Sequence, residues 1–417
     1  MALRSIGLLL AVPGMAPACG NSGHLLGRAP GGVMGDGAVA GADGGADTAD
    51  AKPPGDAGAG ACSGLGPPVM LPLAAGSACA SALATRQHRY ALCFCDSLNV
   101  TAPIYTDAMD SSGAAIGAQP PAAIGVDGDL QAGKIQAFGS VYVAGAGGIT
   151  VSDRIVSLGS LRAAGPTRGT GALFDIGEDA YFGGAMQGFF VVVGTLHVAP
   201  GVDASMAYVN AGGVVVEPVS VAPPCDCGGA GTVDVAGAIA AATAANADAA
   251  AGFGPDRLAA VTTSTLLDIP CGSYALSAID TRAALVLAVH GRALVAVAGD
   301  VVLRAGFTVT LDPGAELDLL VGGRLLTSGS NAIGSMTPAR FRIWVAGSQT
   351  VVFDDDPNVG AVVHAAGAPV TASSGLELNG ALFAKTLTAG AQVNVHFDQS
   401  VFTVGASCAG PPATAVP

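Results

Sequence analysis

Side chains that could do chemistry are concentrated in a short segment near the C-terminus, VNVHFD. Asn394, His396 and Asp398 alternate there with apolar residues, so in a strand they share one face at a spacing of about 6.5–7 Å. His396 and Asp398 could bind one cation together or act as an acid and a base. We favour the alternative, a polar row that hydrogen-bonds to a neighbouring coil or loop, because the sequence identifies no further metal ligands securely.

A second candidate lies in ARFRIWV, where Arg340, Arg342 and Trp344 have the same parity. Trp344 is the only tryptophan of the chain. An outward indole flanked by guanidinium groups could form a platform for a sugar ring or a cation–π contact. The same pattern is typical of a strand that a helix or loop covers, and we favour this structural interpretation.

Three adjacent carboxylates, Asp354, Asp355 and Asp356, follow the strand-like run QTVVF. A bound Ca²⁺ would relieve their mutual repulsion through hard oxygen ligands, so Ca²⁺ is the one cofactor that the sequence brings into consideration. The spacing matches neither an EF-hand nor the calcium-binding nonapeptide repeats. A solvated acidic turn is therefore the favoured interpretation.

The first residues have the pattern of a secretory signal. Arg4 supplies a positive charge, 6–12 an apolar core and 16–19 a small-residue cleavage site. Cys19 resembles the lipidated cysteine of a bacterial lipobox, with alanine in place of the usual leucine three positions earlier, and Gly20 favours sorting to the outer membrane. We expect an exported lipoprotein of the outer membrane or cell surface. The alternative is cleavage just before Cys19 and a freely secreted protein.

The nine cysteines also bear on this choice. If Cys19 is lipidated, the other eight can pair completely in an oxidising compartment. Four of the eight form two CxC motifs, CFC at 93–95 and CDC at 225–227. The full set of disulfide candidates is Cys62, Cys79, Cys93, Cys95, Cys225, Cys227, Cys271 and Cys408.

The two CxC motifs could form a four-thiolate metal site. We favour disulfides, because the thiols of exported proteins oxidise. Cysteines one residue apart rarely bond to each other, since the small ring would be strained. We expect the CFC motif to pair with Cys62 or Cys79 and the CDC motif with Cys271 or Cys408, with the exact connectivity left open.

The composition excludes some partners. Lys plus Arg number 17 against 31 Asp plus Glu, a formal net charge of −14. Nucleic acid is therefore not an expected partner, because it needs clustered cations. Divalent cations and neutral sugars remain as candidate partners. Charged residues make up only 12% of the chain, which is typical of solenoids whose outer faces carry uncharged Ser, Thr, Asn and Gly.

The elements that would position these side chains are short strands. Alternating apolar runs separated by Gly or Pro-Gly fill 266–323 without a helix-length segment. Between 125 and 221, runs such as GSVYVAG and GSLRAAG recur at intervals of roughly 16 to 20 residues, which fits one coil of a parallel β-helix. We predict successive inward rows, among them Leu285, Leu287 and Val289, and Leu317, Leu319 and Val321.

The predicted fold is all-β: a parallel β-helix (β-solenoid) with one inserted or capping α-helix and a small disulfide-rich N-terminal unit. A short helix is expected around 81–89. An Ala-rich helix that Asp234 caps is expected to lie across an edge or end of the solenoid. The expected organisation is a signal peptide 1–19, a disordered Gly/Ala/Asp tether 20–61, a cysteine-rich cap unit 62–100, a first solenoid array 101–222, a CxC loop and Ala-rich helix 223–257, a second solenoid array 258–408 and a loose tail 409–417.

Several motifs between about 223 and 408 occur together in a known family. They are CDC before an Ala-rich helix, P-C-G-x-Y, G-D-V, P-G-A-E-L-D-L-x-V-x-G, R-I-x-V-x-G, and a late N-G-A-L-F-A with H-F-D. In these motifs the chain resembles uncharacterised bacterial secreted lipoproteins that bear a domain of unknown function. Phe397 stands where such proteins often have Tyr. The resemblance supports the architecture and implies no activity.

We therefore expect an exported, lipid-anchored cell-envelope protein with a structural, adhesive or ligand-presenting role and no evident catalytic site. No nucleophile elbow, zinc-protease motif or phosphate loop occurs in the sequence. The alternative is a carbohydrate-active enzyme or a calcium-dependent glycan binder on the same scaffold. The expected partners are the membrane, through an N-terminal lipid, and a glycan or another envelope protein.

Overall fold

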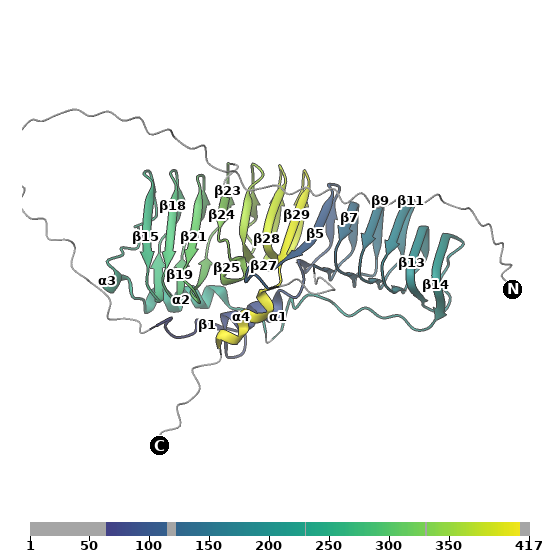
Figure 1. The fold of residues 1–417 in the computed structure, drawn as a ribbon, viewed down its shortest axis with the longest axis horizontal. Helices are drawn as coiled ribbons and strands as arrows, with labels where there is room; N and C mark the ends of the chain where they lie inside the picture. Colours follow the sequence, from purple (N-terminus) through teal and green to yellow (C-terminus); the bar gives the residue numbers. More distant parts are fainter. Residues whose placement is uncertain (1–63, 115–121, 230, 330–331, 409–417) are drawn as a thin grey trace, which may run out of the picture. The chain divides into compact units, whose positions relative to one another are not determined.

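The computed structural model describes residues 64–114, 122–229, 231–329 and 332–408, all within one compact unit, Pro54–Pro417. The expectations for the signal segment, Cys19, the tether, Cys62 and the tail from residue 409 lie outside the described residues. The described strands form a β-solenoid of about 13 parallel turns (Figure 1). This is the fold that the sequence predicts.

The strands pair in parallel from turn to turn and form three ladders. The first contains, in spatial order, β15 (Thr265–Ile269), β18 (Leu285–Val289), β21 (Phe307–Leu311), β24 (Ala332–Gly334), β27 (Asn358–Ala372), β28 (Leu376–Ala389), β29 (Val393–Asp398), β5 (Ile104–Met109), β7 (Leu130–Ala137), β9 (Ile149–Ser157), β11 (Thr167–Ile176), β13 (Met186–Val198) and β14 (Met206–Val216).

The second ladder contains β16 (Gly272–Leu276), β19 (Arg292–Val297), β22 (Glu316–Val321), β25 (Phe341–Val345), parts of β27 and β28, β3 (Leu92–Phe94), β6 (Ile124–Val126), β8 (Val141–Val143), β10 (Leu161–Ala163), β12 (Ala180–Phe182), and parts of β13 and β14.

The third ladder has two parts. One contains β17 (Ile279–Thr281), β20 (Val301–Leu303), β23 (Leu325–Thr327), β26 (Val351–Phe353), and parts of β27 and β28; the other begins with β4 (Leu98–Val100) and continues through parts of β7, β9, β11 and β13.

The two arrays that the sequence predicts join end to end as one solenoid. The last strand of the second array, β29, pairs along its length with β5 of the first, with Val393 opposite Ile104. In the second ladder β28 pairs with β3, with Leu382 opposite Leu92. The chain therefore enters the solenoid at this junction, winds outward to β14, crosses back, and winds from β15 to the junction again (Figure 1).

The core is built from the inward side chains of every turn. The predicted rows of β18 and β22 are confirmed: Leu285, Leu287, Leu317 and Leu319 are each fully buried. Most core residues are Ala, Val, Leu and Ile. Because each inward residue stacks on the equivalent residue of the neighbouring turn, truncating one of these leucines to alanine should cost about 2–5 kcal/mol.

Helices cover one side face and part of one end of the solenoid. They are α1 (Ala80–Gln87), α2 (Val235–Ala244), α3 (Asp248–Ala251), α4 (Val401–Val404) and the short 3₁₀ helices η1 (Pro338–Arg340) and η2 (Gly405–Cys408); a hairpin of β1 (Met70–Pro72) and β2 (Ser77–Cys79) accompanies them. The expected helix around 81–89 is confirmed by α1. The side chain of Asp234 caps α2 as predicted, by accepting from the backbone N–H of Gly237.

The Ala-rich segment differs from the prediction in two ways. It forms α2 and α3 instead of one helix, because the backbone is extended at Ala245 and the N–H of Ala247 donates to the carbonyl of Ser273. In addition, α2 packs on β16, β19 and β22, so it crosses a side face instead of an edge or end. The outward residues Leu294 and Leu320 explain this position, because they are apolar and require cover.

Three disulfides connect distant parts of the described chain: Cys79–Cys408, Cys93–Cys225 and Cys95–Cys227. Cys271 is disulfide-bonded as well. As predicted, neither CxC motif closes on itself, but the partners that we expected for these motifs are wrong. The two motifs pair with each other, because the segment that crosses back from β14 lies alongside β3, and a spacing of one residue matches on both sides.

Candidate functional site

The polar row of β29 lies at the junction of the two arrays. His396 is flanked there by a carboxylate from each neighbouring turn. Its Nδ1 lies 2.6 Å from Asp107 Oδ1 on β5, and its Nε2 lies 2.5 Å from Glu377 Oε1 on β28. Asn394 donates to the other oxygen of Glu377 at 2.8 Å. The row thus connects three successive turns, one of them from the other array.

Electrostatics determine what His396 can do chemically. Hydrogen bonds to Asp107 and Glu377 raise its pKa to about 10. The bond to His396 in turn lowers the pKa of Glu377. At neutral pH the ring is therefore an imidazolium with both nitrogens engaged. It has no free lone pair to act as a general base or to bind a metal.

Asp398 does not join His396, although it has the same parity in the sequence. It is buried, and its carboxylate accepts from the N–H groups of Ser111, Ala339 and Ser400. The reason is that β29 ends at Asp398 and the chain turns into α4. The structure therefore does not bring His396 and Asp398 together as an acid–base or metal pair. The interpretation that we favoured, a polar row bonded to neighbouring turns, holds for Asn394 and His396.

A groove of about 250 Å³ runs beside the polar row. Tyr105, Gln136, Gln392, Asn394 and His396 are among its lining residues. The amide and phenol groups could hydrogen-bond to a hydroxylated ligand. Sequence reasoning missed Asp107 and Glu377, the actual partners of His396, because one is 289 residues away and the other lies on the preceding turn.

Arg342 and Trp344 do not form a ligand face, since both are buried. Arg342 Nε and Nη2 donate to the two oxygens of Asp318 at 2.7 and 2.8 Å, and Nη2 also donates to Glu316 at 2.7 Å. The indole N–H of Trp344 donates to Asp318 at 2.8 Å. This is the covered arrangement that the sequence favoured. The acidic residues Glu316 and Asp318 of β22 are the counter-ions of Arg342.

Burial and charge oppose each other in this cluster. Burial disfavours the charged guanidinium of Arg342, but Asp318 and Glu316 outweigh it and hold its pKa above the ordinary value. Two further buried side chains lie nearby: His88 meets His364 edge to face, and His364 packs against Trp344. Burial lowers the pKa of His364 to about 3. Burial, followed by His364 and Arg342, lowers the pKa of His88 well below its usual value, so both rings are neutral.

Arg340 is separated from the other two residues of its predicted face. It ends η1 and lines a cavity of about 550 Å³ together with Ser111, Thr337, Ser400 and Thr403. Within the described part of the chain, its guanidinium has no hydrogen-bonded or ion-paired partner. Arg292, Asp312 and Glu316 line the cavity as well. Its mixture of charged groups and hydroxyls suits a neutral hydroxylated ligand.

The three aspartates at 354–356 lie in a turn after β26. Asp354 accepts from the hydroxyl of Ser373, and Asp355 accepts from the N–H of Gly329 at 2.7 Å. Asp355 and Asp356 have positive φ values of 65° and 55°, as in tight turns. Two of the three carboxylates therefore stabilise this loop.

The two CxC motifs come together as adjacent disulfides beside Asp127. Its carboxylate oxygen and the sulfurs of Cys225 and Cys227 lie within 4.8 Å of one another. Disulfide sulfurs are not thiolates, so this oxidised arrangement does not make a metal site. Instead, Asp127 accepts from the N–H of Cys225 at 2.9 Å and helps to hold the crossing segment.

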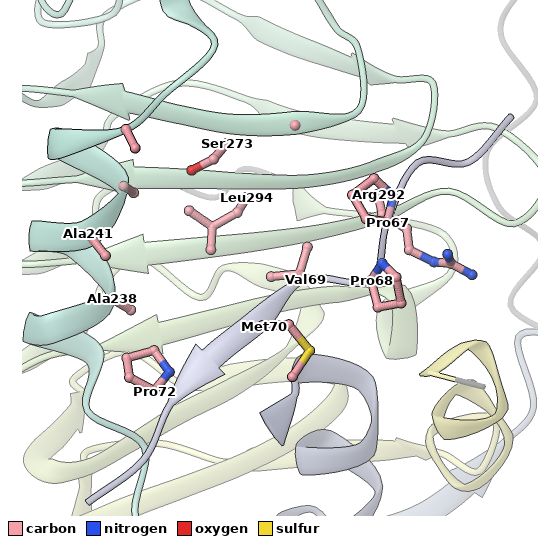
Figure 2. Close-up of a pocket in the computed structure, with 13 residues that line it drawn as sticks. Pro67, Pro68, Val69, Met70, Pro72, Ala238, Ala241, Ser273, Arg292 and Leu294 are labelled. Atoms are coloured by element: carbon pink, nitrogen blue, oxygen red, sulfur yellow. The ribbon is translucent and has the colours of Figure 1, made fainter. Parts of the chain in front are cut away.

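An apolar groove of about 300 Å³ lies between α2 and β1. Figure 2 shows Ala238 and Ala241 of α2 on one side, Val69 and Met70 on the other, and Leu294 of β19 between them. The groove is part of the layer that covers the side face. Its lining contains few polar groups, so it offers no site for chemistry.

The comparisons with known proteins identify one region. Residues 229–404 match a family model described as a domain of unknown function, DUF7305. No curated protein and no solved structure matches the chain significantly. Within the described residues, none of the helices has the length and apolar character needed to cross a bilayer.

Proposed function

We propose that this chain is an exported bacterial lipoprotein, anchored through Cys19, whose solenoid is a non-catalytic scaffold of the cell envelope. The observation that carries the proposal is the set of three disulfides, each of which joins segments at least 132 residues apart. Disulfides of this kind form and persist outside reducing compartments. The secretory pattern before Cys19 supports the same location.

The non-catalytic part of the proposal is supported by the candidate sites. Both nitrogens of His396 are engaged and the ring is charged at neutral pH. Arg342 and Trp344 are buried against Asp318. These groups stabilise the fold. The scaffold is proposed to act by structure, by adhesion or by presenting a ligand-binding surface to another envelope component.

Metabolic labelling with a palmitate analogue tests the anchor. We expect label in the wild-type chain and in a Cys408→Ala control, but none in Cys19→Ala. Fractionation should place the wild-type protein in the outer membrane, and alkylation without reduction should modify none of the described cysteines. Label that persists in Cys19→Ala excludes lipidation at this position, and freely alkylated thiols in cells exclude the oxidising location.

A second candidate function is glycan binding, with or without Ca²⁺. The cavity of about 550 Å³ that contains Arg340 favours it, because the guanidinium of Arg340, several hydroxyls and the carboxylates of Asp312 and Glu316 are a suitable lining for a neutral sugar. Carbohydrate cleavage is the enzymatic version of this alternative.

A glycan array separates these functions. A glycan binder should lose binding in Arg340→Ala and keep it in Arg324→Ala, an exposed arginine already paired with Asp300. Repeating the array with a chelator tests for Ca²⁺. Release of reducing ends from polysaccharides that disappears in His396→Ala overturns the non-catalytic proposal, whereas silent arrays and no release are its expected result.

A further inference from the structure

The two ends of the solenoid differ. At one end β14 pairs with β13 on one side, and within the described residues no strand or helix pairs with its other side. This free edge is Met206–Val216, MAYVNAGGVVV, eleven residues long. It exposes a row of unpaired backbone N–H and C=O groups, which is a template for a further strand.

The side chains at this end are exposed and apolar. Met206, Tyr208, Val214 and Val216 are 67, 67, 62 and 65% exposed. Val214 and Val216 lie over Leu196 and Val198, which point into the solenoid. They are therefore core residues whose outer neighbour is missing. The end presents an open cross-section of the core, and covering it would remove a substantial apolar area from water.

The edge carries none of the usual protection against pairing. Exposed edge strands are normally interrupted by a proline, a charged side chain or a short length. Met206–Val216 contains neither proline nor any charged residue. In a chain with a formal net charge of −14, this strand is a neutral surface on which two copies can approach each other, with the nearest carboxylates, Asp203 and Glu217, outside it.

At the opposite end the last turn is covered over β16 and β17, while β15 pairs with β18 alone among the described strands. There α3 packs on β16, and the ring of Phe253 contacts the ring of Tyr274 in a tilted arrangement. The backbone of 255–261 bonds to the last turn: Ser277 and Asp280 donate to Pro255 and Leu258, and Val261 donates to Asp280. A head-to-tail contact would require β14 to displace this segment. A contact between two β14 ends requires no displacement.

The junction inside the chain is an example of two coil ends that cover each other. There the outer turns of two arrays, which are separate in the sequence, stack through β29 and β5 and bury their inward residues. The β14 end offers the same components, a strand edge and an apolar cross-section.

We infer that two copies of this chain associate end to end through β14. The two β14 edges pair antiparallel about a two-fold axis, and the exposed valines of each copy cover those of the other. The contact is self-complementary and uses the free edge of both copies, so it closes as a dimer instead of growing into a fibre.

Sedimentation velocity of the full chain over a range of concentrations tests this dimer. Every sample carries Cys19→Ala, so that an attached lipid cannot cause association. We expect a monomer–dimer equilibrium and at least about a tenfold higher dimer Kd in Tyr208→Lys and in Val214→Lys, because the two-fold axis brings like charges together. The control is Leu266→Lys, which replaces an apolar residue with 65% exposure on β15 and should leave the Kd unchanged.

Hydrogen exchange gives a second measurement that does not depend on a variant. The amides of 206–216 should become protected as the concentration rises, while those of β15 should not change. A chain that is monomeric throughout, with exchange in 206–216 independent of concentration, overturns the inference. A dimer that persists in both lysine variants, or assemblies that grow beyond a dimer, also overturn it. Protection of 206–216 in the monomer would show that another segment of the same chain covers this end.

Discussion

Imidazole side chains occur on this solenoid between carboxylates of neighbouring turns. His396 lies between Asp107 and Glu377 at the junction. His290 has the same arrangement within one array, between Asp268 and Asp312. In both cases the charged ring offsets two carboxylates that stacking would otherwise place near each other, so these histidines stabilise contacts between turns.

The stability that His396 contributes should depend on pH. Its pKa is raised from 6.5 to about 10 in the folded chain, so the contribution is complete below the unfolded pKa of about 6.5 and is lost as pH rises through about 10. We expect His396→Gln to lower the free energy of unfolding by about 1–2 kcal/mol at pH 6, after allowance for solvent screening, and by much less at pH 10. Urea unfolding of both proteins at each pH measures this.

His290→Gln is the matched control for this experiment. Its side chain is 48% exposed, and its pKa is raised in the same direction by Asp312 and Asp268. Because this pair is more exposed and lies away from the junction, its effect should be smaller at every pH. Equal losses for His396→Gln at pH 6 and pH 10 would contradict the role of the charged ring.

Arg342 should be far more important for stability than Arg340. Removing its guanidinium leaves Asp318 buried without its counter-ion and Glu316 with the more distant Arg292, 3.8 Å away, so Arg342→Ala is expected to lower the free energy of unfolding by about 3–5 kcal/mol. Arg340→Ala removes a side chain that has no partner in the described chain, so it should change the free energy of unfolding by less than about 0.5 kcal/mol. Denaturant unfolding of the two variants compares them, and similar losses would contradict this account of the cluster.

At the scale of elements, the paired CxC motifs fix the segment that crosses from β14 back to α2. Cys225 and Cys227 attach this segment to β3 at the junction. The N–H of Cys225 also donates to Asp127. The crossing segment is therefore held at the junction of the two arrays. Its position there determines where α2 begins to cover the side face.

Removing one of these disulfides should weaken the whole solenoid. The double substitution Cys93→Ala with Cys225→Ala is expected to cost about 2–5 kcal/mol, since it releases a long loop. Peptide mapping without reduction should recover peptides linked through Cys93–Cys225 and Cys95–Cys227. Recovery of Cys93 linked to Cys227 would contradict the register, and an unchanged stability in the double variant would contradict the role of the bridge.

At the scale of the whole chain, the region that matches DUF7305 is not closed by its own residues. Residues 229–404 include β28 and β29, whose outer neighbours β3 and β5 come from the first array. The first array in turn loses β28 and β29 as neighbours of β3 and β5 when the second array is absent. Each array therefore supplies the surface that covers the other.

A fragment of residues 229–404 should reveal this dependence. Without β3 and β5, the edges of β28 and β29 and the core beside Val393 are open, so we expect it to aggregate or to unfold at lower denaturant than the full chain. Size-exclusion chromatography with far-UV circular dichroism measures both properties. A monomeric fragment as stable as the full chain would show that the junction contributes little.

Local patterns in the sequence were sufficient for the strands and their faces. The alternation in 285–289 and 317–321 places leucines and valines inward, because successive side chains of a strand point to opposite faces. The same rule identified the polar row of Asn394 and His396, and the preference for aspartate at helix N-termini identified the cap at Asp234. The alternation rule failed at Asp398, because the direction of a side chain changes where a strand ends. Alternation alone does not indicate the residue at which a strand ends.

The sequence by itself determined the solenoid, its inward rows and the polar residues that can interact between turns. Only the tertiary structure decided which turn lies next to which. Stacking depends on the fit of whole coil edges and not on local periodicity, so residues far apart in the sequence become neighbours. For this reason Asp107 reaches His396, the two CxC motifs meet, helices cover Trp344, and β14 remains at an open end.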